Sequence, residues 1–226
     1  MAVEFDGDSS FVDEGSLVYL QGAQFALAFR CYLRSVALND EIISQFTSAT
    51  GGVRVALIIA TTTFTLQIGA ATNVNCSISN SVETGTWQHW FIAYDGSQST
   101  NATKLRIFLN GVEQTVSFST TVPTSIVSPG GLPLTMGSIT ATRSMTGLLS
   151  DLMIWNVVLP DSVLKSQHQS FNPLQTSGLQ LWEPLHDGVV FKDYSGNNRD
   201  TITNVGVVRG CIGNGVSMGH PVLELA

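Results

Sequence analysis

The chain has 226 residues, and only 12% of them are charged, about half the share of an average soluble protein. The net charge is −7 with a total of only 10 lysines and arginines, so no basic surface for nucleic acid is predicted. No apolar run approaches the ~20 residues that a membrane-spanning helix needs, so no membrane insertion is predicted. Without a visible linker or internal repeat, residues 1–226 are predicted to form a single domain.

Short runs rich in Val, Ile, Phe and Thr recur along the chain between clusters of Gly, Asn, Ser and Asp. This punctuation is typical of β-sandwiches and barrels, and strands do not alternate with helices as in a parallel α/β sheet. Strands are predicted over residues 3–6, 10–12, 25–33, 41–47, 54–61, 64–68, 87–94, 105–109, 116–118, 134–136, 146–155, 179–185 and 201–208.

A β-hairpin is predicted within residues 84–114. The second strand-like run of this segment ends at Asn110-Gly111. A type I′ turn needs positive φ at both central residues, and Asn-Gly satisfies that need better than other pairs.

One short helix is predicted over residues 159–169. Pro160 and Asp161 suit a helix start, and two to three turns need support from the sandwich to be stable. The tail 209–226 ends in apolar residues and is predicted to dock on its own domain or on a neighbouring chain. Cys31 lies in an apolar run and is predicted to be a core residue, and the three cysteines of the chain show no zinc or disulfide spacing.

Six segments resemble, in order, the laminin G-like group of the concanavalin A-like lectin/glucanase superfamily. They are AVEFDGDSSFV, TWQHWFIAYDG, KLRIFLNGVEQ, PLTMGS, TGLLSDLMIWNVVLPDSVL, and LQLWEPL with DYSGNNRDTITNVGVV. The resemblance covers residues 2–208. It implies an all-β, concanavalin A-like jelly-roll sandwich of two antiparallel sheets with one short helix. It places the large aromatic residues in or near the core, namely Trp87, Trp90, Phe91, Phe108 and Trp155.

No enzymatic activity is predicted. The glucanase branch of this superfamily carries its two carboxylates on one strand as Glu-x-Asp-x-x-Glu or Glu-x-Asp-x-Glu, and neither spacing occurs here. The acidic pairs Asp13-Glu14 and Asp40-Glu41 are interpreted as loop or turn charges, because adjacent strand residues face opposite ways. His89, on a predicted strand, is interpreted as structural.

Calcium is the one cofactor that the resemblance leaves open, because several relatives hold it with oxygens from loops at the sheet edge. The metal ligands predicted here are Asp6, Asp95 and Asp151, with Asp8 and Asn101 as further oxygen donors. Calcium prefers six to eight oxygen ligands, and no compact acidic loop supplies them. Asp6 and Asp95 each precede a glycine and are also typical turn formers.

Glycan binding would need exposed aromatic rings and polar loop tips. Tyr32, Trp182, Tyr194 and the loops 97–103 and 195–199 are the residues that could serve, although Trp182 alternates as a strand residue does and fits the core as well. The sequence indicates no particular sugar.

The first functional hypothesis is a non-enzymatic, lectin-like structural or adhesion protein on the surface of a phage particle. A capsid decoration subunit or a tail-associated subunit would assemble with itself and with other virion proteins, and the absence of a signal-like start fits release by lysis. The alternative is a free carbohydrate-binding module, extracellular by a non-classical route, that recognises cell-surface glycans with or without calcium. A glycosidase is the least favoured hypothesis.

Overall fold

The structure is a computed structural model of the chain. It describes residues 2–7, 11–13, 19–37, 40–47, 51–56, 62–69, 73–126, 132–137, 144–185, 191–200, 203–205 and 208–210. The predicted calcium ligand Asp8 lies outside these residues, as do Glu14 and residues 211–226 of the predicted docking tail.

Strands account for most of the regular structure. The first eight strands are β1 Ala2–Asp6, β2 Phe11–Asp13, β3 Gln24–Ser35, β4 Glu41–Thr47, β5 Gly51–Ala56, β6 Phe64–Gly69, β7 Asn73–Ile78 and β8 Trp87–Asp95. The remaining elements are α1 Asn101–Lys104, β9 Leu105–Leu109, β10 Val112–Glu113, β11 Ser117–Phe118, β12 Thr135–Met136, β13 Thr146–Trp155, α2 Asp161–Ser166, the 3-10 turn η1 Gln167–Gln169, β14 Leu179–Glu183, β15 Thr203–Val205 and β16 Val208–Gly210.

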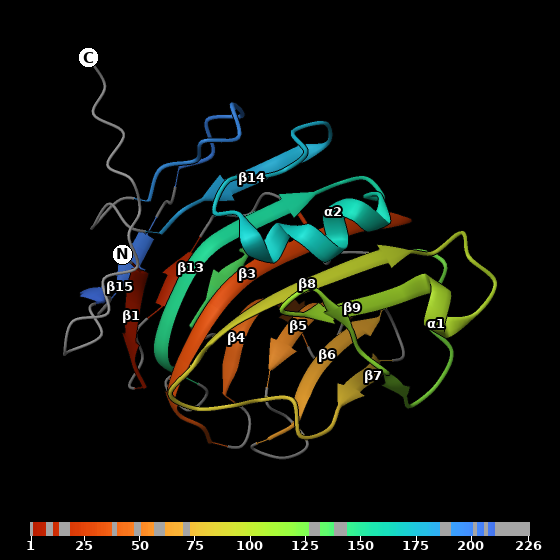
Figure 1. The fold of residues 1–226 in the computed structure, drawn as a ribbon, viewed down its shortest axis with the longest axis horizontal. Coiled ribbons are helices and arrows are strands. Elements are labelled where there is room, and N and C mark those ends of the chain that lie inside the picture. Colours follow the sequence, from red (N-terminus) through yellow and green to blue (C-terminus); the bar gives the residue numbers. More distant parts are fainter. Residues whose placement is uncertain are drawn as a thin grey trace.

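Two antiparallel sheets form the sandwich seen in Figure 1. Sheet 1 has the strand order β10-β9-β8-β3-β13-β1-β16, and β14 pairs with β13. Sheet 2 has the order β11-β7-β6-β5-β4-β12-β2-β15. Each sheet combines consecutive strands, β8 to β10 and β4 to β7, with neighbours that are distant in sequence, such as β3 beside β13 and β4 beside β12. The predicted all-β sandwich is confirmed.

The main core lies between the sheets. Strand β3 turns Phe25, Leu27 and Phe29 into this core, because successive side chains of a strand point to opposite faces. From sheet 2, Phe64 stacks on Trp90 of sheet 1, with ring centroids 3.9 Å apart and ring planes 12° apart. This contact joins the two sheets through the largest apolar surfaces available to them.

A second apolar cluster covers the outer face of sheet 1. It joins Ala26 and Ala28 of β3 with Phe91, Phe108 and Trp155 and with residues of the α2 region, among them Leu159 and Leu164. Figure 1 shows α2 lying across this sheet. The predicted helix is therefore confirmed in place, although α2 begins at Asp161 and its last turn is the 3-10 turn η1.

Among the described residues, no helix has the length and apolar character to cross a membrane.

The hairpin prediction at Asn110-Gly111 is confirmed. Both residues have positive φ, 50° and 80°, and they join β9 to β10. The side chain of Asn110 also accepts a hydrogen bond from the backbone N–H of His89 at 2.8 Å, which ties the turn to β8.

Three elements differ from the sequence prediction. Strand β7 and the single turn α1 were not predicted. The predicted strand 201–208 is instead two short strands in different sheets, since β15 pairs with β2 and β16 pairs with β1. Residues 209 and 210 of the predicted tail belong to β16.

Replacing Phe64 with alanine tests the joint between the sheets. Phe64 is fully buried, so Phe64→Ala should lower the free energy of unfolding by about 3–5 kcal/mol through lost burial and a residual cavity. Urea unfolding followed by tryptophan fluorescence measures the change. The control is Val112→Ala, at a side chain that is 64% exposed, which should stay within about 0.5 kcal/mol of the wild type. Equal losses in the two variants would contradict this account of the core.

Candidate functional site

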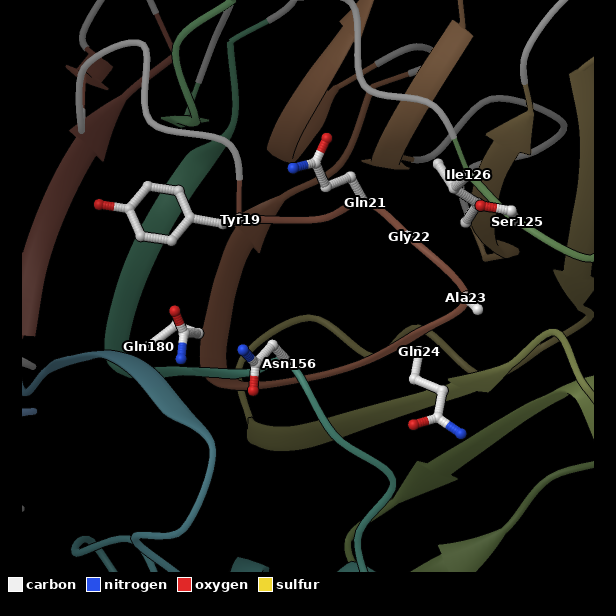
Figure 2. Close-up of a pocket in the computed structure, with 9 residues that line it drawn as sticks. All are labelled: Tyr19, Gln21, Gly22, Ala23, Gln24, Ser125, Ile126, Asn156 and Gln180. Atoms are coloured by element: carbon white, nitrogen blue, oxygen red, sulfur yellow. The ribbon is translucent and has the colours of Figure 1, made fainter.

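A groove of about 670 Å³ opens at the end of the sandwich where β3 begins and β13 ends. Four separate segments line it: the approach to β3, the loop after β11, the residue after β13, and β14 (Figure 2). Its lining residues are Tyr19, Gln21, Gly22, Ala23, Gln24, Ser125, Ile126, Asn156 and Gln180.

The groove is polar, and none of the described residues that line it carries a charged side chain. Four carboxamides, from Gln21, Gln24, Asn156 and Gln180, are joined by the hydroxyl of Ser125. Each carboxamide offers two N–H donors and an oxygen acceptor, so the lining can both donate to and accept from a neutral polar ligand. Figure 2 shows Asn156 and Gln180 on one side of the opening and Ala23 and Ser125 on the other.

Backbone hydrogen bonds hold the approach to β3 in place. Gly22 and Ile126 exchange two of them, Gly22 N–H to Ile126 O at 2.8 Å and Ile126 N–H to Gly22 O at 2.9 Å. Gly22 has φ of +87°, in the left-handed region where glycine is favoured. The N–H groups of Tyr19 and Leu20 both donate to the buried Oε1 of Gln45, each at 3.1 Å. These contacts anchor one wall of the groove to sheet 2.

Two of the groove amides are oriented by charged neighbours outside the lining. Nε2 of Gln24 donates to Oδ1 of Asp95 at 3.3 Å. On the opposite wall, Nη1 of Arg199 donates to the backbone oxygen of Gln180 at 3.1 Å and to its Oε1 at 3.3 Å. The Arg199 guanidinium also lies over the ring of Tyr19, 5.4 Å from its centroid. An acceptor-only carboxylate and a donor-only guanidinium thus hold amides on two sides of the groove.

Both loops that the sequence offers for glycan contact are tied to residues at or next to the groove. In loop 195–199, Arg199 contacts Gln180, and the loop is organised by the carboxylate of Asp193, which accepts from Ser195 N–H at 2.8 Å and from Arg199 N–H at 3.1 Å. In loop 97–103, Ser97 donates to Asp95, the residue that holds Gln24.

The predicted aromatic contacts lie elsewhere. Tyr32 packs against Trp87 on the outer face of sheet 1, with centroids 5.8 Å apart, and Trp182 packs against Tyr194 with centroids 5.7 Å apart. Trp182 is half-buried beside the outer apolar cluster. None of these four rings lines the groove.

The three predicted calcium ligands are not brought together. Asp95 pairs with Gln24 at the start of β3, whereas Asp6 pairs with Thr146, whose other neighbour is Ser35 at the end of β3. Eleven residues of extended strand separate these ends by roughly 36 Å. Within the part of the chain that the structure describes, no three His, Cys, Asp or Glu residues form a group able to hold a metal ion. Asn101, a further predicted donor, uses its side chain to bind Thr120 O and Val122 N–H.

Asp151 is a buried ion-pair partner in the middle of β13. It has φ of 55° at an irregularity of the ladder with β3, and its Oδ2 lies 3.2 Å from Nε of Arg30. Burial raises the pKa of Asp151 to about 6, although a hydrogen bond from Ser150 and the charge of Arg30 act in the opposite direction. Arg30 also donates to the backbone oxygens of His168 and Ser170, at 2.8 and 3.2 Å.

The acidic pair Asp40-Glu41 is only partly a turn feature. Asp40 accepts from Ala37 N–H at 2.8 Å, as a turn residue does. The prediction was wrong for Glu41, which is buried in β4 and accepts from Nη1 of Arg54 at 2.8 Å. The arginine on the neighbouring strand makes burial of this carboxylate tolerable. Asp13, of the other pair, is the last residue of β2.

His89 is buried on the outer face of sheet 1, in agreement with a structural role. Burial, and then the charges of Arg30 and His168, lower the pKa of His89 to about 3. The imidazole is therefore neutral over the physiological range.

The fold and this groove define a lectin-like β-sandwich with a polar groove at one end. The chain belongs to the Concanavalin A-like lectin/glucanases superfamily, since the Laminin_G_3 family matches residues 6–164. A search of curated proteins found no match.

Among solved structures, a Bacteroides ovatus protein described provisionally as carbohydrate binding shares 17% identity and a TM-score of 0.62. The match covers 92% of this chain and 58% of that protein, so the chain spans little more than half of it.

Two further structures share the fold. Domain 4 of a Geobacillus stearothermophilus arabinanase, in complex with arabinotriose, has 14% identity and a TM-score of 0.56 over 74% of this chain and 76% of that one. The CBM40 of a Ruminococcus gnavus IT-sialidase, bound to α2,3 sialyllactose, has 10% identity and a TM-score of 0.57 over 74% and 95%. At these identities the likeness shows the fold alone.

A pH series tests the buried state of His89. A pKa depressed from 6.5 to about 3 stabilises the fold above pH 6.5, and this contribution is lost as the pH falls. It amounts to about 3 kcal/mol between pH 7 and pH 4. Glutamine cannot take up this proton, so His89→Gln should lose about 3 kcal/mol less stability than the wild type between pH 7 and pH 4.

The raised pKa of Asp151 acts in the opposite direction on stability, because its stabilising contribution is lost as the pH rises through about 6. Wild type and His89→Gln both retain Asp151, so the difference between their free energies of unfolding in urea at each pH reports on His89 alone. If the two free energies ran parallel over the pH series, the burial of His89 would be refuted.

Proposed function

We propose that this chain is a non-catalytic carbohydrate-binding module whose groove holds a neutral glycan. The observation that carries the proposal is that the described lining offers four carboxamides and a hydroxyl and includes no charged side chain. Sugar hydroxyls donate and accept hydrogen bonds, and carboxamides match both roles at short range. The groove volume of about 670 Å³ lies within the range of small-ligand sites.

The comparisons support this proposal over the other hypotheses. The solved relatives include an arabinanase domain in complex with arabinotriose and a sialidase module bound to sialyllactose. Hydrolysis of a glycosidic bond uses two carboxyl groups that flank the bond. The described lining of the groove contains none, which favours binding without cleavage. Attachment to a phage particle and self-association stay predictions from the sequence, and light scattering on the purified chain would test the second of them.

A glycan array that carries arabinotriose, maltotriose, cellotriose and sialyllactose tests the proposal. We expect binding of at least one neutral trisaccharide, confirmed by calorimetry, and no release of smaller sugars on incubation. Binding of sialyllactose alone would overturn the neutral-glycan proposal, and cleavage products would overturn the non-catalytic one.

Blocking the groove should abolish that binding. Ala23 is exposed and its methyl group borders the opening, so Ala23→Phe places a ring in the groove without disturbing the core (Figure 2). The variant should bind the neutral trisaccharide at least about tenfold more weakly, a loss of ~1.4 kcal/mol. Ala37→Phe is the matched control, because Ala37 is also exposed but follows the far end of β3. Equal affinities of the two variants in calorimetry would place the binding site elsewhere.

A further inference from the structure

Asp95 lies next to the groove, at the first residue pair between β3 and β8. It is the last residue of β8 and pairs with Gln24, the first residue of β3. Its Oδ1 accepts from Nε2 of Gln24 at 3.3 Å, but Asp95 itself does not line the opening. The contact therefore joins a charged residue outside the described lining to the amide of a residue that belongs to that lining.

The chemistry of this contact determines which way the Gln24 amide faces. An ionised carboxylate can only accept hydrogen bonds, so the NH₂ group of Gln24 must turn toward Asp95. The carbonyl oxygen Oε1 then points away from Asp95. In Figure 2 the Gln24 side chain extends away from Gln21 and Ser125, with its oxygen turned to the side of Asn156 and its nitrogen to the other side.

The carboxylate of Asp95 is itself held in place. Oδ1 accepts from Ser97 N–H at 3.1 Å and from Ser97 Oγ at 2.7 Å, and Oδ2 accepts from Nε2 of Gln98 at 2.8 Å. The backbone next to it is fixed too, because Gly96 N–H donates to Ala23 O at 2.7 Å. Asp95 is thus a rigid acceptor, and the orientation that it imposes on Gln24 is maintained without a ligand.

We infer that Asp95 is a positioning residue of the groove, which presents Oε1 of Gln24 as a fixed acceptor and so selects a glycan hydroxyl that donates at this point. The inference rests on the proposed function and adds a specificity determinant to it. It also gives Asp95 a role different from the calcium ligand that the sequence predicted.

The first test needs no glycan. In ¹⁵N-labelled full-length protein, the Gln24 side-chain amide is assigned as the signal that disappears in Gln24→Glu. Burial acts to raise the pKa of Asp95, but hydrogen bonds from Ser97, Gln98 and Gln24 together hold it below its ordinary value. The Gln24 signal should therefore stay constant from pH 7 downward and shift only when Asp95 takes up a proton. Tyr94, which interacts electrostatically with Asp95, does not titrate in this pH range, because burial raises its pKa to about 12.

In Asp95→Asn this pH-dependent shift should be absent. A Gln24 signal with the same pH dependence in wild type and Asp95→Asn would overturn the inference. So would a shift of the wild-type signal on addition of calcium chloride that EDTA reverses, because Asp95 would then be acting as a metal ligand.

The second test is a double-mutant cycle on affinity for the neutral trisaccharide that binds in the array. Asp95→Asn can donate as well as accept, so it releases the orientation of Gln24, and Gln24→Glu places two carboxylates together. Each single change should weaken binding about tenfold, the scale of one charge-assisted hydrogen bond. In Gln24→Glu/Asp95→Asn, the new amide can donate to the new carboxylate, which again presents an acceptor to the groove.

The double variant should therefore recover affinity to within about threefold of wild type, at an unchanged net charge. Additive losses in the cycle would overturn the inference, since a purely structural Asp95 gives no rescue. If no trisaccharide binds the wild type, the proposed function fails, and the amide titration still decides whether Asp95 orients Gln24.

Discussion

The two hydrogen-bonded ladders of β3 are the constraint on which the rest of the structure depends. This strand pairs with β8 along one edge and with β13 along the other. Its side chains are buried on both faces, with Phe25 and Leu27 in the main core and Ala26 and Ala28 under the outer cluster. A shift of one residue would exchange these two sets, so packing on each face enforces the register. The same register places Gln24 beside Asp95 and Ala26 beside Trp155, and so it positions the walls of the groove.

Charge is also buried on the outer face, where it costs free energy unless it is paired. Arg30 meets this cost by pairing with Asp151 and by donating to the carbonyls of His168 and Ser170. One guanidinium therefore connects the sheet to the segment that follows α2. Asp151 has a left-handed backbone, which is uncommon for a residue other than glycine, and its carboxylate pairs with Arg30. This cluster lies away from the groove lining and contributes to the scaffold.

Local signals were sufficient for most of the sandwich, because alternation and turn chemistry act over a few residues. Asn110-Gly111 predicted its hairpin for this reason. Strand β7 was missed although Val74, Cys76 and Ile78 alternate toward the core, because the asparagines and serine between them also favour turns. Glu41 was misinterpreted since its ion-pair partner, Arg54, comes from the neighbouring strand, and no sequence spacing within one strand reveals such a pair.

The groove could not be predicted from the sequence, because it combines four segments that are separate in the chain. Nothing local in the sequence brings Gln21 and Gln24 to Asn156 and Gln180. Polar loop tips are a local signal, and for that reason loops 97–103 and 195–199 could be named from the sequence as segments able to serve glycan contact. Asp95 shows the limit of that signal: Asp-Gly at a strand end suits a turn, a metal ligand or an acceptor for a neighbouring amide. Only the register of β3 with β8 discriminates among these roles, since it places the Gln24 amide within hydrogen-bonding distance of the carboxylate.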